Sequence, residues 1–396
     1  MKILMVHNYY SGRGGEDVST ESEIKLLRDN GHEVRVYTKN NKNIQNLRGI
    51  QLIRVAWKTV WNHRVYRDLI GLIREFKPDV VHFQNTFPQI SPSAYWACRK
   101  EGVPVVQTLH NYRLLCPSGI LFHNGKIYEK NVGKLFPFDA VLNKVYRNSF
   151  LATFVLSLML FFHRIIGTYS NKVDIYLAVS DFVRKKYIRA GFSSNQIVVK
   201  RNFVFDGKKR KASGEYALFF GRLSSEKGIF TLLNAWKNIN YELRIAGEGP
   251  LKRETEEFIQ NNNIRCVKLL GALNGNEVKK ALNGCKFVIV PSEWYEPAAR
   301  TIIESFSQGI PVVASNIGGN SELVKDNYNG FLFEAGNVRD LKNKVNLLIR
   351  DGGIFKKTGE NAFKSYVLNY SSDKNYADLI KIYKSLLSKQ EMLKNG

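Results

Sequence analysis

Two carboxylates, Glu296 and Glu304, stand eight positions apart in the segment PSEWYEPAARTIIE, whose composition changes from loop to helix. Proline is favoured at the first position of a helix, so we predict that a helix begins at about Pro297. Glu296 would lie at the helix mouth, where free backbone N–H groups favour phosphate, with Glu304 about 12 Å further along. The pair suits a ligand with hydroxyls at both ends and phosphates between them. Two solvated glutamates on a helix face are the alternative.

Two cations follow a predicted strand in the same half of the chain. Tyr216-Ala-Leu-Phe-Phe-Gly221 is an apolar run typical of a buried parallel strand, and Arg222 and Lys227 come on the loop after it. Open α/β sheets bind ligands at the carboxyl ends of their strands, where an arginine fork and a lysine charge can hold a diphosphate. An ordinary solvated basic loop is the alternative. Taken with the two glutamates, the cations indicate a nucleotide sugar.

The order of several short motifs is more specific than any one of them. The second half contains, in order, Gly221-Arg222 with Lys227-Gly228, Ala246-Gly-Glu-Gly-Pro250, Glu296 to Glu304, Gly309-Ile-Pro-Val-Val-Ala-Ser315 and Gly318-Gly319. The first half contains Gly14-Gly15-Glu16-Asp17, Gly31-His-Glu-Val34, Phe83-Gln-Asn-Thr-Phe87 and Thr108-Leu-His110 running on to Pro117. In this order the motifs resemble the retaining glycosyltransferases of family four. The resemblance runs from about Met1 to Tyr383.

The resemblance implies an α/β protein of GT-B architecture, with two Rossmann-like domains facing each other across a cleft. Residues 1–205 would form the domain that handles the acceptor, and residues 206–373 the domain that binds the nucleotide sugar. The last helix, about 374–396, would return to the first domain. At 396 residues the chain is long enough for two domains with separate cores.

The resemblance also assigns roles to individual residues. The donor-binding residues it implies are Gly14, Gly15, Arg222, Lys227, Glu248, Glu296, Pro297, Ala298, Ala299, Arg300 and Glu304. The acceptor-binding residues it implies are His110, Asn111 and Tyr112, and the catalytic residues are His110, Glu296, Arg222 and Lys227. The family's usual mechanism is front-face attack with retention, in which the leaving phosphate helps to deprotonate the acceptor hydroxyl.

Two features qualify these roles. The family commonly has a glycine-containing turn after the first glutamate, whereas this chain has Ala298-Ala299, so the donor contacts there are open. His110 follows the apolar run Val105–Leu109, and a lone histidine at that place is either structural or in contact with the sugar or acceptor. The chain has no Asp-x-Asp pair of the kind that holds a divalent ion on a diphosphate, so we expect neither a metal ion nor another cofactor.

Short apolar runs alternate with helical stretches along the chain, which predicts parallel sheets flanked by helices. One helix is expected over Ser19–Asn30, and a hinge at the charged, glycine-bounded stretch Asp206–Gly214. The strands expected in the first half are Ile3–Val6, Val34–Tyr37, Val80–Phe83, Val105–Leu109 and Ile175–Val179. Those expected in the second half are Leu218–Phe220, Glu242–Ala246, Val267–Leu269, Phe287–Val290, Val312–Ala314 and Gly330–Leu332.

The net charge of +24 is concentrated in the first half of the chain. Residues 1–210 contain 33 Lys and Arg against 15 Asp and Glu, a balance of +18, which leaves 26 against 20, or +6, for residues 211–396. A positive field attracts anionic membranes or nucleic acid, and charge that serves only solubility is the alternative. A lipid-linked acceptor at the inner face of a membrane would fit the asymmetry.

The most apolar segment, Phe150–Phe162, is shorter than the roughly 20 residues that span a bilayer. We predict a core helix there, with a membrane-surface helix as the alternative. Met1–Val6 lacks a cleavage site and is predicted to be a first strand and not a secretory leader. The four cysteines form no C-x-x-C pair and are expected to be buried thiols of a cytoplasmic protein, peripheral on the cytoplasmic membrane if the basic half binds lipid.

These observations predict a retaining hexosyltransferase that moves a sugar from a UDP-, GDP- or similar nucleotide sugar to a saccharide or lipid-linked saccharide. The expected pathway is the biosynthesis of a bacterial surface polysaccharide, such as capsule, O-antigen, lipopolysaccharide or exopolysaccharide. The first alternative is a GT-B nucleotide-sugar epimerase or hydrolase. The second is a basic nucleic-acid-binding protein, although the chain lacks an aromatic-interleaved basic motif and a helix-turn-helix signature, and we expect no nucleic-acid partner.

Overall fold

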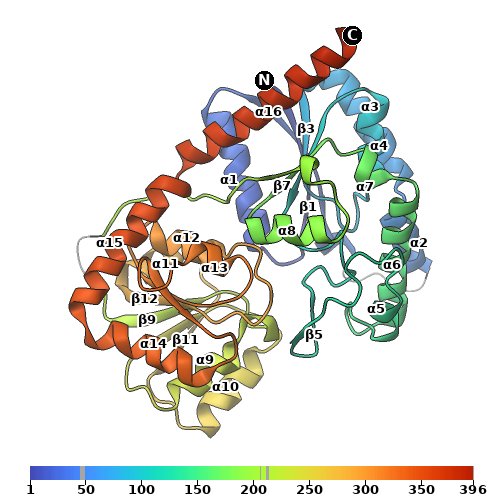
Figure 1. The fold of residues 1–396 in the computed structure, drawn as a ribbon. Coiled ribbons are helices and arrows are strands. Elements are labelled where there is room, and N and C mark those ends of the chain that lie inside the picture. Colours follow the sequence, from blue (N-terminus) through green and yellow to red (C-terminus); the bar gives the residue numbers. More distant parts are fainter. Residues whose placement is uncertain (45–49, 206, 211–213, 396) are drawn as a thin grey trace. The chain divides into compact units, whose positions relative to one another are not determined.

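The structure is a computed structural model that describes residues 1–44, 50–205, 207–210 and 214–395. The chain divides into two compact units (Figure 1). The first unit consists of residues 1–121, 128–200 and 375–396, and the second of residues 122–127 and 201–374. The predicted hinge, Asp206–Gly214, includes residues 206 and 211–213, which lie outside the described residues.

A parallel sheet of six strands forms the centre of the first unit. Its strands are β1 (Lys2–Tyr9), β2 (Glu33–Asn40), β3 (Val80–Asn85), β4 (Val105–Leu109), β7 (Ile175–Ala178) and β8 (Ile197–Val199). They lie in the order β2-β1-β3-β4-β7-β8. β3 and β4 are buried along their whole length, as expected for parallel strands that helices cover on both faces.

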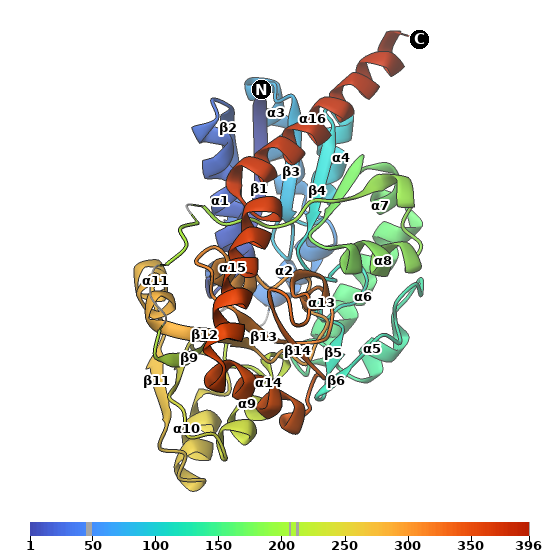
Figure 2. The same ribbon diagram turned by 60° about the vertical axis from the view of Figure 1, so that its left-hand side comes forward.

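Helices surround this sheet, and the last helix of the chain is one of them (Figure 2). α1 and α16 cover one face, because Ile24, Leu27, Leu379 and Tyr383 pack with the strand residues Ile3 and Met5. The helices of the first unit are α1 (Gly15–Asp29), α2 (Ile50–Val60), α3 (His63–Phe76), α4 (Ser93–Lys100), α5 (Phe138–Leu142), α6 (Phe150–Ile165), α7 (Thr168–Asn171), α8 (Asp181–Arg189) and α16 (Ser372–Asn395), with 3-10 turns at Asn41–Ile44 and Ser194–Gln196.

The second unit contains another parallel sheet of six strands. Its strands are β9 (Tyr216–Phe220), β10 (Leu243–Ala246), β11 (Val267–Gly271), β12 (Cys285–Val290), β13 (Val312–Ser315) and β14 (Gly330–Phe333). They lie in the order β11-β10-β9-β12-β13-β14. β5 (Phe122–His123) and β6 (Lys126–Ile127) form a separate antiparallel pair.

Both faces of the second sheet are covered by helices. The helices of this unit are α9 (Ile229–Trp236), α10 (Lys252–Asn261), α11 (Gly275–Gly284), α12 (Arg300–Phe306), α13 (Asn320–Leu323), α14 (Val338–Arg350) and α15 (Gly352–Asn369), with a 3-10 turn at Ser225–Lys227. Side chains of α9 and α14 share one core with inward residues such as Phe219 and Ile289. Side chains of α11, α12 and α15 share the core on the other face with Leu218 and Val288.

The predicted fold class is confirmed, since both units are Rossmann-like parallel sheets covered by helices. Each expected strand overlaps an observed one, whereas the short strands β5, β6 and β8 were missed because they are only two or three residues long. The helix expected from Ser19 begins at Gly15, because Asp17 accepts a hydrogen bond from the Gly14 N–H at 3.1 Å and caps the helix there. Cys98, Cys116 and Cys285 are buried free thiols, as expected, and Cys266 is partly buried.

The apolar segment Phe150–Phe162 lies in α6 and is only half buried. Leu156, Met159 and Leu160 face the interior, whereas Phe150 and Leu151 are exposed. The prediction of a core helix is therefore wrong for one side of α6. No helix in the described ranges has both the length and the apolarity needed to cross a membrane.

Candidate active site

The strand order of the second sheet changes direction at β9, with β10 on one side and β12 on the other. In open sheets of this kind, ligands bind at the carboxyl ends of the strands beside this point. The loop after β9 carries Arg222 and Lys227, and the loop after β12 carries Glu296. The topology therefore brings the two predicted cations and the first predicted carboxylate to one edge of the sheet.

Lys227 and Glu296 form an ion pair between these two loops. Lys227 Nζ lies 2.8 Å and 3.0 Å from the two carboxylate oxygens. The carboxylate also accepts hydrogen bonds from Ser292 Oγ at 3.0 Å and from Trp294 Nε1 at 2.8 Å. The lysine ammonium lies over the Trp294 ring, 5.2 Å from its centroid. Because Glu296 is buried, these donors compensate for the solvent that its charge has lost.

Arg222 differs from Lys227 in that its side chain is exposed and has no hydrogen-bond or ion-pair partner among the described residues. Its loop is nevertheless fixed, because the Leu223 N–H donates to the Glu248 carbonyl at 3.0 Å. Gly247 permits this close approach of the two loops, since a Cβ there would lie 1.8 Å from the Gly221 oxygen. Arg222 is thus a cation on a fixed loop with its guanidinium open to an anion.

The helix predicted to begin at Pro297 begins three residues later, at Arg300. Ala299 precedes it in an extended conformation, with φ −64° and ψ 108°. The Glu296 carbonyl accepts a hydrogen bond from the Gly319 N–H at 2.6 Å, a partner far away in the sequence. The prediction was wrong because this tertiary contact overrides the local preference of proline. Glu296 therefore does not lie at a helix mouth, and the two alanines precede the helix.

The remaining predicted donor residues of this unit are engaged within the protein. Arg300 Nε lies 2.8 Å from Glu304 Oε1, and Arg300 also donates to the Phe203 carbonyl at 3.1 Å. Burial raises the pKa of Glu304, and the Arg300 charge opposes the rise. Glu248 is exposed and pairs with Lys252 at 2.8 Å. Arg300 thus holds Glu304, a carboxylate that the family resemblance assigned to donor binding.

The first sheet changes its strand order at β1, with β2 on one side and β3 on the other. Gly14 and Gly15 follow β1, and a Cβ on either glycine would meet nothing within 4 Å, so the space around them is open. His110 and Asn111 follow β4 at the same edge of the sheet. Tyr112, in contrast, is completely buried, so its side chain presents no surface to an acceptor.

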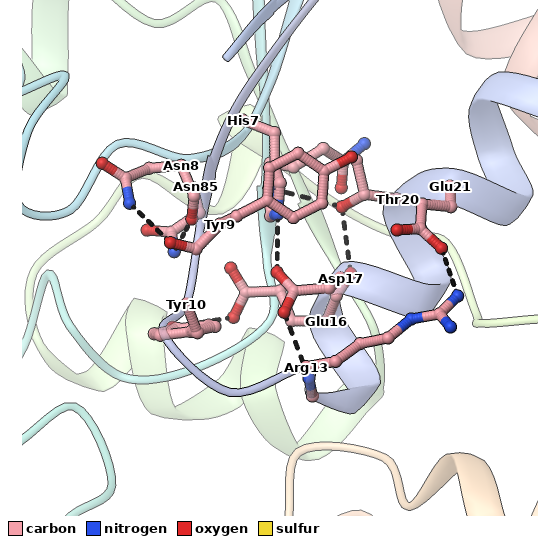
Figure 3. Close-up of polar contacts among 12 residues, drawn as sticks. His7, Asn8, Tyr9, Tyr10, Arg13, Glu16, Asp17, Thr20, Glu21 and Asn85 are labelled. Carbon is pink, nitrogen blue, oxygen red and sulfur yellow. Dashed lines mark hydrogen bonds and ion pairs between the residues drawn. The ribbon is translucent and has the colours of Figure 1, made fainter. Parts of the chain in front are cut away.

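Glu16, in the first turn of α1, was not predicted as a site residue but contacts Asn111. Figure 3 shows it beside Tyr10. Its Oε2 accepts hydrogen bonds from Tyr10 Oη at 3.1 Å and from Asn111 Nδ2 at 3.0 Å. Its Oε1 is buried and has no partner among the described residues. Burial raises the pKa of Glu16 to about 7, against the lowering effects of His7 and Asn111. The carboxyl group is therefore able to exchange a proton near neutral pH.

Neighbouring contacts hold the start of α1 in place. His7 Nε2 lies 2.8 Å from Asp17 Oδ1, and both side chains are buried. Thr20 Oγ1 donates to the Glu16 carbonyl at 3.0 Å. Figure 3 shows these side chains between β1 and the first turns of α1. The sequence contained one signal of these buried polar contacts. Asp17, Thr20 and Glu23 are polar at helical spacings, where a buried helix face should be apolar.

His110 ends a chain of hydrogen bonds that sequence reasoning missed. Gln84 Nε2 donates to Glu23 Oε1 at 2.7 Å, so the amide oxygen of Gln84 faces His110. His110 Nε2 lies 2.6 Å from that oxygen and must carry the proton, which leaves Nδ1 as an acceptor. Burial lowers the pKa of His110 to about 3, so the imidazole is neutral at physiological pH.

The other end of this chain is a buried ion pair between Glu23 and Lys200. Burial raises the pKa of Glu23, but the charges of Lys200 and then of His82 outweigh this effect and lower the pKa to about 2. His82 Nδ1 also lies 2.7 Å from Tyr383 Oη on α16. The orientation of His110 thus depends on α1, β3 and a helix from the other end of the chain.

The chain matches two protein-family models. The Glycosyltransferase Family 4 model matches residues 13–205, and the model of glycosyl transferases group 1 matches residues 200–365. The chain belongs to the GT-B glycosyltransferases of family 4. Membership of family four and the prediction of a transferase are therefore confirmed.

Relatives of this glycosyltransferase cover nearly its whole length. It is 26% identical to an uncharacterised glycosyltransferase of Methanocaldococcus jannaschii, over 98% of this chain and 99% of that protein. It is 24% identical to an uncharacterised 42.6 kDa protein in the cps region of Klebsiella pneumoniae, over 82% of this chain and 87% of that protein. Among solved structures, Anabaena HepE in complex with UDP and glucose has a TM-score of 0.70 at 18% identity, covering 97% of this chain and all of that chain. That likeness shows the shared fold.

Proposed function

We propose that this glycosyltransferase binds a nucleotide-sugar donor at the carboxyl edge of the second sheet and transfers the sugar with retention. The observation that carries the proposal is the Lys227–Glu296 ion pair at the point where the strand order changes. The loop of Lys227 also carries Arg222, whose side chain has no ion-pair partner among the described residues. Two cations at such an edge suit a diphosphate, and a buried carboxylate beside them suits sugar hydroxyls. The Anabaena HepE structures with UDP-glucose support a uridine nucleotide.

The chemistry would depend on charge that is already in position. The departing nucleoside diphosphate gains negative charge, which Arg222 and Lys227 would stabilise without reorganising. The neutral His110 would present Nδ1 as an acceptor to a hydroxyl of the sugar or the acceptor. The attack would come from the face of the leaving group, and the departing phosphate would help to take the proton. These cations carry the charge that a metal ion otherwise supplies, so we propose that transfer continues in EDTA.

We further propose that the acceptor is a saccharide or lipid-linked saccharide of a bacterial surface polysaccharide. A relative in a cps region of Klebsiella pneumoniae supports this pathway. The excess of basic residues in the first half suits an acceptor that is carried on an anionic membrane. Gly14, Gly15, Glu16 and Asn111 would contact the acceptor or the donor phosphates in the first unit.

A thermal-shift screen with UDP-, GDP- and ADP-sugars identifies the donor, because a ligand that binds only the folded protein raises the Tm. With that donor, Lys227→Met should lower kcat about 100-fold. The matched control is Lys268→Met, which removes an exposed lysine of the same unit that pairs with Glu242. An absence of stabilisation by every nucleotide sugar would contradict the proposal. Release of nucleoside diphosphate without a new glycoside would indicate the epimerase or hydrolase instead.

A further inference from the structure

Helices α2, α5 and α6 of the first unit carry a concentration of exposed apolar side chains. α6 packs against both α2 and α5, and Figures 1 and 2 show the three helices side by side. Of the eighteen most exposed large hydrophobic residues among those described, ten lie here, and the other eight are spread over the rest of both units. The ten, which we call the α2–α5–α6 face, are Ile53, Trp57, Leu135, Phe138, Leu142, Phe150, Leu151, Phe154, Phe162 and Ile165.

The orientation of α6 is fixed with polar residues inside and aromatic residues outside. Its buried side includes Thr153, Ser157 and His163 among apolar residues. His163 Nε2 lies 2.7 Å from the Val60 carbonyl, and Ser157 Oγ donates to the Thr153 carbonyl at 2.8 Å. A helix that faces water normally has the reverse pattern, with its polar side outside. Turning the helix over would break the bond from His163 to Val60, which lies outside α6, whereas the Ser157 bond lies within the helix.

Three phenylalanines of this face, together with the partly buried Phe136 and Phe161, form one aromatic cluster. The Phe136 ring lies 4.5 Å from Phe138, 5.6 Å from Phe161 and 6.3 Å from Phe154, measured between centroids. Phe150 stacks parallel to Phe154 at 6.4 Å. Trp57 on α2 is 70% exposed, and Leu142 on α5 is 73% exposed. Contiguous apolar patches of this kind mark an interaction surface.

The charge around the patch is almost entirely positive. Residues 50–60 and 130–165 contain seven basic residues and one acidic residue, a balance of +6. Asp139, the acidic residue, pairs with Lys134 at 3.0 Å. The basic residues are Arg54, Lys58, Lys130, Lys134, Lys144, Arg147 and Arg164. A second copy of the chain would oppose this charge with the same charge, whereas an anionic lipid surface complements it.

We propose that the α2–α5–α6 face docks on an anionic lipid bilayer. The aromatic and aliphatic side chains would enter the headgroup region, and exposed basic side chains around them, such as Arg54, Lys58, Lys144 and Arg147, would contact lipid phosphates. α6 has 16 residues and lies along the surface, because a helix that spans a bilayer needs roughly 20. Docking would bring the enzyme to the lipid-linked acceptor of the proposed function, and in this respect the inference rests on that function. Vesicle binding needs neither donor nor acceptor, so its failure and a failure of transfer are distinguishable.

The test is co-sedimentation of the full chain with vesicles of phosphatidylcholine, with and without about 30% phosphatidylglycerol. The wild type should bind the anionic vesicles and not the neutral ones, and binding should weaken as salt is added. The double substitution Phe138→Ser and Leu142→Ser should reduce binding on the order of tenfold or more. Both side chains are exposed, so the substitutions should leave the Tm unchanged.

The matched control is Leu368→Ser, which removes an exposed leucine of the second unit and should leave vesicle binding unchanged. A second readout is the fluorescence of Trp57, whose emission should shift to shorter wavelength on anionic vesicles but not in Trp57→Phe. The proposal would be overturned if the wild type did not bind anionic vesicles. It would also be overturned if the double variant, Phe138→Ser with Leu142→Ser, bound them as well as the wild type does. A wild-type dimer that becomes monomeric in the double variant would assign the face to a second copy instead.

Discussion

A single hydrogen bond, between Gln84 and His110, determines which imidazole nitrogen His110 presents. The Glu23 carboxylate orients the Gln84 amide, so Nε2 of His110 keeps the proton and Nδ1 accepts. Burial keeps the pKa of His110 at about 3. The imidazole is therefore uncharged at physiological pH, and its Nδ1 can accept a hydrogen bond.

Gln84→Glu tests this assignment. A carboxylate beside His110 favours the charged imidazole and raises its pKa, so the acceptor nitrogen is lost in acid and regained as the pH rises. We expect kcat at neutral pH to fall about tenfold or more, and the pH profile to gain an acidic limb between about pH 5 and 8. Gln196→Glu, on the opposite side of β7, is the control and should keep the wild-type profile. An unchanged profile in Gln84→Glu would contradict the role of His110.

Among the elements, the loops after β9 and β10 are joined closely enough that only glycine fits at position 247. Gly247→Ala places a Cβ 1.8 Å from the Gly221 oxygen, in addition to the strain of its φ of +150°. We expect the free energy of unfolding to fall by about 2–3 kcal/mol. The control is Gly336→Ala, which has a φ of +80° but open space around it and should cost about 1 kcal/mol. If denaturant unfolding showed that the two substitutions lower the free energy of unfolding equally, the two loops would separate easily.

α16 stabilises the first unit through buried residues that are far away in the sequence. Tyr383 Oη lies 2.7 Å from His82 Nδ1, and its ring is completely buried. Tyr383→Phe leaves the imidazole nitrogen without this partner and should lower the free energy of unfolding by about 1–3 kcal/mol. Met392→Ala on the same helix removes a side chain that is 78% exposed, and should change stability by less than about 0.5 kcal/mol. If the two substitutions changed the free energy of unfolding by similar amounts, the Tyr383 contact would not be what holds α16 on the first unit.

For the whole molecule, buried histidines make stability depend on pH. Burial lowers the pKa of His82 and His163 to about 4 and that of His110 to about 3, below the value of about 6.5 in an unfolded chain. The unfolded state therefore binds more protons in this range, so stability is complete above about pH 6.5 and is lost as the pH falls towards these values. Glu16, with its pKa raised to about 7, acts in the opposite direction but is a single group.

We therefore expect the free energy of unfolding to decrease by a few kcal/mol between pH 7 and pH 4.5. The measurement is guanidinium unfolding at both values. His163→Asn should reduce the decrease, because asparagine has no proton to gain, whereas His63→Asn at an exposed position should not. A stability that does not change over this range would show that the histidines are protonated in the folded state as well.

Local patterns were sufficient to predict much of the fold. Apolar runs such as Phe287–Val290 gave strands because a buried parallel strand is apolar on both faces. The meeting of Lys227 and Glu296 at one edge of the sheet could be predicted because each follows a strand whose carboxyl end faces that edge. The helix start at Pro297 could not be predicted, because Gly319, 22 positions later, binds the Glu296 carbonyl.

By itself the sequence determined the two α/β units, their strands, the family and the residues at the strand ends, because these follow from local period and the order of motifs. Only the tertiary structure decided the partners of Glu296, the chain from Lys200 through Glu23 and Gln84 to His110, and the buried Glu16 oxygen. It also decided that α6 turns its aromatic side outward. Each of these depends on groups that are distant in sequence and meet only after packing, and the burial that shifts their pKa values does not exist before the chain folds.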